Sequence, residues 1–117
     1  MMKKADIVYL KHIRDAISRI EEYTKAVGYE DFIKNDLIQD GVIRQLEIIG
    51  EATKRISTQF KSNNPHIPWR DIAGMRDKLI HDYFGVDIEA VWDTVKRDIP
   101  ALKKEVKKIL SEDQKKS

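Results

Sequence analysis

The sequence predicts an all-α protein, folded as an up-and-down antiparallel bundle of two long helices plus several shorter ones. Apolar residues recur at three- and four-residue steps over two long stretches, which is the period of an amphipathic helix. Charged residues make up 36% of the chain and aromatic residues only 8%, which favours a bundle with a solvated exterior over a sheet protein. No alternating strand pattern appears. The 117 residues suit one small domain, 1–117, whose tail from about 111 we expect to be frayed.

The first long helix is predicted over 6–27. Its apolar residues follow the helical period: Ile7, Leu10, Ile13, Ile17, Ile20 and Val27. Gly28 is the predicted stop signal, since glycine commonly ends helices. A helix of this length is ~30 Å long and spans a small domain. A single helical turn is expected over 29–35.

The second long helix is predicted over 36–60. Its buried line is formed by Leu37, Val42, Leu46, Ile49, Ile56 and Phe60. Gly41 and Gly50 lie inside this helix, where each glycine costs about 1 kcal/mol relative to alanine. Both glycines therefore predict close packing of the helix against a neighbour.

Shorter elements are predicted in the second half of the chain. Residues 61–68 (KSNNPHIP) form a loop, 69–75 a short helical turn, and 76–84 a helix that ends near Gly85. Asp87 is expected to cap a further helix, and Pro100 to bend or restart it. The apolar residues of this last region are Ile88, Val91, Trp92, Val95, Ala101, Leu102, Val106, Ile109 and Leu110. Trp69 and Trp92 fall on core spacing and are predicted to be packing residues.

Composition narrows the function classes. Cysteine is absent, which excludes disulfides and thiolate chemistry. No apolar run reaches about 18 residues, and the amino terminus lacks a signal-peptide pattern, so we expect a soluble, cytoplasmic chain with no membrane partner. A net charge of only +2 is low for a protein that binds nucleic acid through bulk charge. Any contact with RNA must therefore be local or built from more than one subunit.

The most informative motif is R-x4-H-x-Y, formed by Arg76, His81 and Tyr83. A guanidinium, an imidazole and a phenol can hold and cleave a phosphodiester without a metal. On an ideal helix Arg76 and Tyr83 lie within about 20° of each other, whereas His81 is roughly 140° from Arg76. A self-contained site is thus disfavoured, and a twofold dimer, which supplies two arginines and two histidines at its axis, is favoured.

Other interpretations of these residues remain open. Arg76 and His81 could be surface groups paired with Asp77, Asp82 or Asp87. Asp77 and His81 could supply two metal ligands, but no second cluster completes a set, so neither a metal nor a cofactor is expected.

Two further groups of polar residues have structural interpretations. His12 and His66 are expected to be structural or solvated. Arg44, Glu47, Glu51 and Lys54 form one stripe on the second long helix, which is typical of a salt-bridged exposed face or, alternatively, of a wall of the RNA cleft.

Three blocks of the chain resemble the HepT-like proteins of the HEPN (higher eukaryotes and prokaryotes nucleotide-binding) superfamily. They are YLKHIRDAISRIEEYT, GVIRQLEIIGEATKRIS and IPWRDIAGMRDKLIHDYFGVDIEAVWDTVKRDIPALKKEV. The resemblance covers nearly the whole length and implies a HEPN-like fold. It further implies a metal-independent ribonuclease, the toxin of a toxin–antitoxin pair, that acts as a homodimer with its cleft at the interface. Arg76 and His81 would be its catalytic pair and Tyr83 the third residue of the motif.

The resemblance also implies a partner, a nucleotidyltransferase antitoxin of the MntA type that transfers AMP to Tyr83. Asp77 departs from the family pattern, in which asparagine is common. A carboxylate near an RNA phosphate is unfavourable unless Lys78 or an arginine neutralises it, although Asp77 could instead orient His81. The RNA target stays open, with tRNA as one candidate. The alternative function is a non-catalytic helical module that binds a nucleotide or a nucleotidyltransferase.

Overall fold

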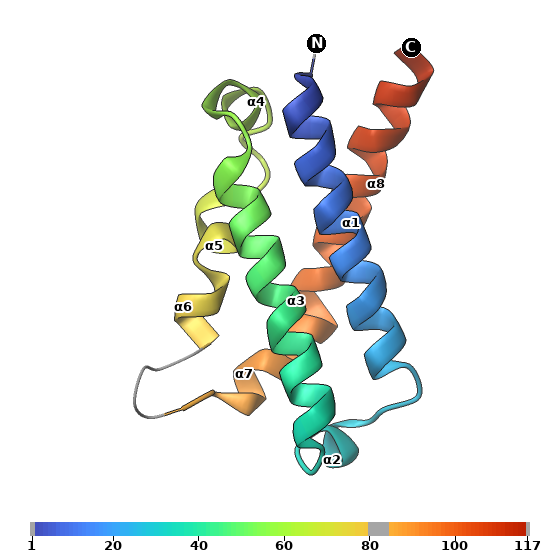
Figure 1. The fold of residues 1–117 in the computed structure, drawn as a ribbon, viewed down its shortest axis with the longest axis vertical. Coiled ribbons are helices and arrows are strands. Elements are labelled where there is room, and N and C mark those ends of the chain that lie inside the picture. The colour runs from blue at the N-terminus through green and yellow to red at the C-terminus, as the bar shows by residue number, and fades with distance from the viewer. Residues whose placement is uncertain (1, 80–84, 117) are drawn as a thin grey trace.

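The computed structural model describes residues 2–79 and 85–116, which form an elongated helical bundle with extents of 45 × 30 × 20 Å (Figure 1). Its long helices are α1 (Lys4–Thr24), α3 (Asp36–Arg55) and α8 (Ile99–Lys116). The predicted all-α bundle is confirmed, and within the described ranges Val86, a single bridge residue, is the nearest approach to a strand. Helix α8 reaches Lys116, and fraying of the tail stays a prediction.

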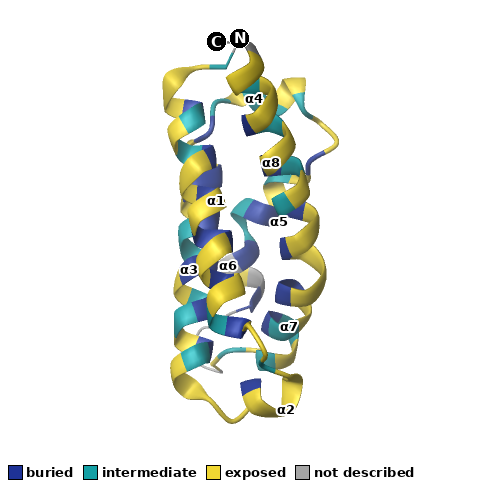
Figure 2. Ribbon diagram, turned by 90° about the vertical axis from the view of Figure 1, so that its right-hand side faces the viewer, coloured by how far each residue is buried: buried dark blue, intermediate teal, exposed yellow. Residues whose placement is uncertain are grey.

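Helices α1 and α3 pack against each other along their lengths, and α8 packs on α1. Buried positions line the inner faces of the long helices (Figure 2). The predicted core positions Leu10, Ile13, Ile17 and Ile20 of α1 are all at most 1% exposed, as are Val42, Leu46 and Ile49 of α3. Burial of each of these side chains stabilises the bundle by about 1.5–3 kcal/mol.

The sequence predicted that the first helix stops at Gly28, but α1 ends at Thr24. The left-handed residue after the helix is Ala26, with φ 60°, whereas Gly28 has φ −90° and an extended backbone. Gly28 instead precedes the first residue of α2 (Tyr29–Phe32), a short helix whose Phe32 is fully buried.

The predicted helix over 36–60 is wrong at its carboxyl end. Helix α3 stops at Arg55, and α4 (Thr58–Asn63) starts after Ser57. Ser57 donates its backbone N–H (2.8 Å) and its hydroxyl (2.6 Å) to the carboxylate of Asp6, a residue of α1 that is 2% exposed. The Ser57 hydroxyl oxygen also caps α4 by accepting from the N–H of Phe60. The break is therefore made by a tertiary contact with α1, which no local pattern in the sequence reveals.

Leu37 was predicted to be buried, and it is 82% exposed. Asn35 caps α3 by accepting from the N–H of Ile38, which fixes where the helix starts. Leu37 therefore lies in the first turn of α3, where its side chain remains in solvent.

The carboxyl-terminal part follows the sequence prediction closely. Asp87 caps α7 (Ile88–Asp93) by accepting from the N–H of Ala90 at 3.0 Å. A π-helical turn, η2 (Thr94–Asp98), then leads into α8, with Pro100 in its first turn. Because proline has no N–H, the carbonyl of Lys96 loses its α-helical donor, and a change of helical register at this point accommodates the loss.

Both tryptophans pack against the core, as predicted. The indole N–H of Trp69 donates to the carbonyl of Asn64 (2.9 Å) and closes the loop that precedes α5 (Trp69–Ala73). The ring of Trp92 lies against that of Phe32, with centroids 5.0 Å apart. Among the described residues, no helix combines the length and the apolar character needed to cross a membrane.

Candidate functional site

The motif arginine lies on the side of α3 opposite to α1. Arg76 is the second residue of α6 (Met75–Leu79), which packs with α5 against α3 (Figure 1). The side chain of Arg76 and the whole of His81 and Tyr83 lie outside the described residues. The predicted convergence of Arg76 and His81 from two copies therefore stays a prediction. Asp77, the residue that departs from the family pattern, is exposed on α6.

Helix α6 is held by two buried side chains. Met75 is 6% and Leu79 2% exposed, and their spacing of four residues puts both on one face of the helix. Asp77 lies about 200° around the helix from Met75, which agrees with its exposure. The backbone of α6 that carries Arg76 is thus fixed against the core.

The chain returns to the end of α6 immediately after the segment that holds His81 and Tyr83. The N–H of Asp87 donates to the carbonyl of Leu79 at 2.9 Å, and so joins the end of α6 to the start of α7. Gly85 has φ 85°, a conformation that favours glycine, and it sits just inside this closure. The predicted helix over 76–84 is described as far as Leu79, and its remainder falls outside the described residues.

Both glycines of α3 make the close approaches that the sequence predicted. A Cβ atom on Gly41 would lie 3.2 Å from the ring of Tyr23 in α1. A Cβ atom on Gly50 would lie 3.2 Å from the backbone oxygen of Ala73, at the end of α5. The second contact brings the α3 backbone directly against the segment that leads into α6.

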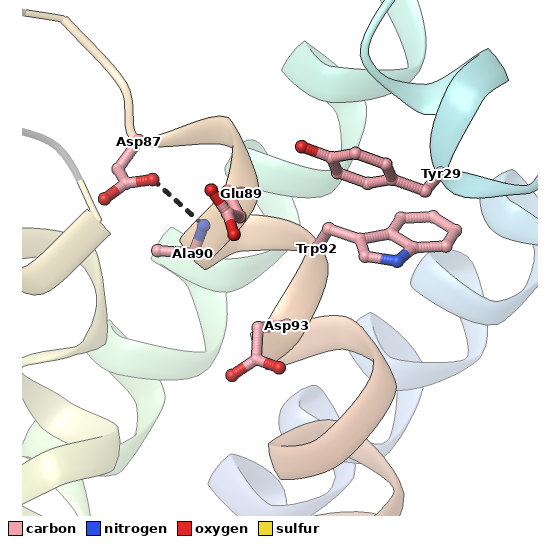
Figure 3. Close-up of a pocket in the computed structure, with 6 residues that line it drawn as sticks. All are labelled: Tyr29, Asp87, Glu89, Ala90, Trp92 and Asp93. Carbon is pink, nitrogen blue, oxygen red and sulfur yellow. Dashed lines mark hydrogen bonds between the residues drawn. The ribbon is translucent and has the colours of Figure 1, made fainter.

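A pocket of about 640 Å³ opens between α7, with its cap Asp87, and Tyr29 of α2. Its lining residues are Tyr29, Asp87, Glu89, Ala90, Trp92 and Asp93 (Figure 3). The rings of Tyr29 and Trp92 are 6.0 Å apart, and the carboxylates come from α7 and its cap. Three carboxylates disfavour an RNA phosphate, so this pocket is a poor candidate for the RNA cleft. No pattern in the sequence predicts this pocket, because Tyr29 is distant in the chain from α7.

The remaining polar predictions concern solvated groups. His66 Nε2 lies 3.0 Å from Glu105 Oε2, and His12 lies edge-on to Tyr9, both exposed. No three metal-ligand side chains come together within the part of the chain that the structure describes.

The polar stripe on α3 behaves partly as a salt-bridged face. Lys54 Nζ lies 3.6 Å from Glu51 Oε1, with both side chains more than half exposed. Arg44 is also exposed, and Glu47 is partly buried. At the carboxyl end of this stripe, Glu51 and Lys54 therefore form the solvated ion pair that was expected.

Together, the fold and the motif define a small helical-bundle protein whose motif arginine lies on the short helix α6. Comparison with known families gives the particular family. The family model described as "Ribonuclease HepT-like" matches residues 13–109, and the chain belongs to this family. The predicted class of enzyme, a ribonuclease, is confirmed at the level of the family.

Curated relatives agree with this membership. A "Probable ribonuclease HepT" of Thermococcus cleftensis is 53% identical over 108 residues, covering 92% of this chain and 98% of the relative. A "Putative RNase" of Methanocaldococcus jannaschii is 49% identical over 112 residues, covering 95% and 97%. Another protein of that organism, "Gamma-glutamylcyclotransferase and putative RNase", is 50% identical, and this chain spans 50% of its length. No solved structure matches the chain.

Proposed function

We propose that this protein is a metal-independent ribonuclease toxin of a cytoplasmic toxin–antitoxin system, which cleaves RNA at a site between two copies of the chain. The observation that carries the proposal is the family match over 13–109, which spans the motif that this chain retains in full. The names of the relatives, ribonucleases in each case cited above, support the substrate class.

The chemistry follows from the three motif groups. His81 of one copy accepts the proton of a ribose 2′-hydroxyl, whose oxygen attacks the adjacent phosphorus. The P–O5′ bond breaks, and His81 of the second copy gives its proton to the departing 5′-oxygen. Arg76 stabilises the additional negative charge of the phosphorane. The products are a 2′,3′-cyclic phosphate and a free 5′-hydroxyl, and no metal takes part.

The need for two copies follows from the helical spacing of the motif. Arg76 and His81 are about 140° apart on an ideal helix, so one helix directs them to different faces. Two copies related by a twofold axis supply two histidines, which allows one to act as base and the other as acid. They also pool two arginines, which compensates for the low net charge of the chain.

Regulation of this site would act through Tyr83. A nucleotidyltransferase antitoxin would transfer AMP to the phenol oxygen, with pyrophosphate leaving from the nucleoside triphosphate. The anionic adduct would lie near Arg76 in sequence and satisfy the cation that otherwise holds RNA phosphate. Asp77, four residues before His81 in the sequence, would orient the imidazole rather than bind phosphate.

RNA cleavage by the purified protein in the presence of a chelator tests the catalytic proposal. We expect Arg76→Ala and His81→Ala each to lower cleavage by about 10²-fold or more. Equal cleavage by the wild type and His81→Ala would contradict the catalytic role and favour the non-catalytic binding module.

Mixed dimers test the shared site. In dimers that pair one wild-type copy with one His81→Ala copy, the shared cleft keeps a single histidine, which cannot act as both base and acid, so we expect cleavage far below about half of the wild-type rate. If every site lies within one chain, these mixed dimers keep about half of the wild-type rate.

Co-expression with a nucleotidyltransferase antitoxin tests the regulatory step. Mass spectrometry should find one AMP on Tyr83, and Tyr83→Phe should carry none. If Tyr83 carries no AMP in a complex whose ribonuclease activity is neutralised, AMP transfer is not how the antitoxin acts.

A further inference from the structure

We propose that Gly50 is a positioning residue for the ribonuclease site, because its lack of a side chain lets α5 and α6 lie close enough to α3 to place Arg76 correctly. The inference rests on the proposed function for its catalytic readout. Gly50 lies in α3, outside the motif, and its proposed role is to set the position of the motif arginine.

The contact that carries the inference is between backbones. A Cβ atom on Gly50 would lie 3.2 Å from the oxygen of Ala73, 3.7 Å from the oxygen of Ile72 and 3.9 Å from the carbonyl carbon of Ala73. All three atoms belong to the last turn of α5. Ala73 precedes Arg76 by three residues, and Gly74 alone separates α5 from α6. A displacement of the Ala73 carbonyl is therefore passed directly to the first turn of α6.

A methyl group at position 50 cannot be accommodated by rotation of a neighbouring side chain, because the neighbour is a carbonyl. The chain on both sides of Ala73 is anchored in the core, with Ile72 5% and Met75 6% exposed. The added volume must therefore move α5 and the start of α6 away from α3 by a few tenths of an ångström. At the far end of α6, the bond from Asp87 N–H to the Leu79 carbonyl, 2.9 Å long, should respond to that movement.

Gly41 provides a matched control in the same helix. It is nine residues from Gly50, about 13–14 Å along the axis and half a turn around it, so it faces α1 instead of α5. Its Cβ atom would also lie 3.2 Å from a neighbour, but that neighbour is the ring of the half-buried Tyr23, which can rotate. Gly41→Ala and Gly50→Ala bring the same gain in helix propensity and differ in the atom that they displace.

The test compares RNA cleavage by the wild type, Gly41→Ala, Gly50→Ala and His81→Ala. We expect Gly50→Ala to lower kcat roughly tenfold, since misplacing a catalytic group by a fraction of an ångström costs part of the hundredfold lost for a displacement of 1 Å. KM should change little, because Arg76 acts mainly on the negative charge that develops in the transition state. Gly41→Ala should cleave like the wild type. Hydrogen exchange should show faster exchange of the Asp87 amide in Gly50→Ala and an unchanged rate in Gly41→Ala.

Three outcomes would overturn the inference. The first is a wild-type kcat for Gly50→Ala, and the second is an Asp87 amide that exchanges as in Gly41→Ala. The third is a Gly50→Ala protein that loses its helical circular dichroism, since the inference requires a local displacement in an intact bundle. If the wild type and His81→Ala cleave RNA equally, or neither cleaves, the proposed function fails instead. Exchange at Asp87 then still decides whether Gly50 positions α6.

Discussion

The two sides of α3 are built differently. On one side α3 packs against α1, whose large apolar core residues such as Ile17 are at most 1% exposed. On the other side it meets the short helices α5 and α6, where the α3 backbone at Gly50 approaches the Ala73 carbonyl. The α1 side buries more apolar surface and should supply more of the stability. The α5–α6 side positions the motif arginine, so its small displacements should affect chemistry more than folding.

The largest expected effect on stability is that of Ile17→Ala in α1, where Ile17 is 1% exposed. Removing this side chain leaves a cavity beside α1 and should lower the free energy of unfolding by about 2–5 kcal/mol, measured by urea unfolding. The folded fraction should retain its rate of RNA cleavage. A large loss of cleavage per folded molecule would contradict the expectation that the α1 side supplies stability without affecting the chemistry.

Some elements were predictable from the sequence because their causes are local. The penalty for glycine within a helix predicted close approaches at Gly41 and Gly50, and the capping preference of aspartate predicted the role of Asp87. The break after Arg55 was not predictable, because it depends on Asp6, 51 residues before Ser57. Ala26 ends α1 with a positive φ that alanine rarely adopts, so no pattern favoured it over Gly28.

The candidate site also has some features that were predictable from local sequence and others that depend on distant residues. The motif indicated groups able to cleave a phosphodiester, and the resemblance to HepT-like proteins implied a ribonuclease, which the family match confirms. The predicted helix over 76–84 correctly placed Arg76 on a helix. The packing of α6 against α3 depends on the buried side chains of Met75 and Leu79 and on the contact of Gly50 with the Ala73 carbonyl. Gly50 and Ala73 are more than 20 residues apart in the sequence, so no local pattern predicts that they meet. The acidic and aromatic pocket beside Trp92 likewise needs Tyr29 from the other end of the chain.

The second largest effect is expected for Asp6→Ala, at the junction of α1, α3 and α4. This change removes the acceptor for both the N–H and the hydroxyl of Ser57, and should cost about 1–3 kcal/mol of unfolding free energy. Asp15→Ala is the matched control, because Asp15 is an exposed aspartate of the same helix that pairs with Arg14. Equal effects of the two changes would show that the Asp6–Ser57 contact does not hold the junction.

Asp87→Ala should separate stability from activity most clearly. Loss of the cap on Ala90 should cost about 1 kcal/mol of unfolding free energy. Asn35→Ala removes the corresponding cap of α3, from the N–H of Ile38, and should cost about the same. Only Asp87 adjoins the closure onto Leu79, so Asp87→Ala should slow RNA cleavage more than Asn35→Ala does. Equal rates of RNA cleavage in Asp87→Ala and Asn35→Ala would contradict the expectation that the α5–α6 side affects activity more than the rest of the bundle does.

The smallest effect is expected for Glu105→Gln, which weakens an ion pair remote from both sides of α3. Glu105 lies 3.0 Å from His66, whose side chain is 58% exposed, so solvent screens the pair. We expect the unfolding free energy to change by less than about 0.5 kcal/mol. Glu21→Gln is the matched control, because Glu21 pairs with Lys103 of the same helix α8 at 2.7 Å and is also exposed. A larger loss in Glu105→Gln alone would mean that the loop containing His66 holds α5 in place, and that the short-helix side draws part of its stability from α8.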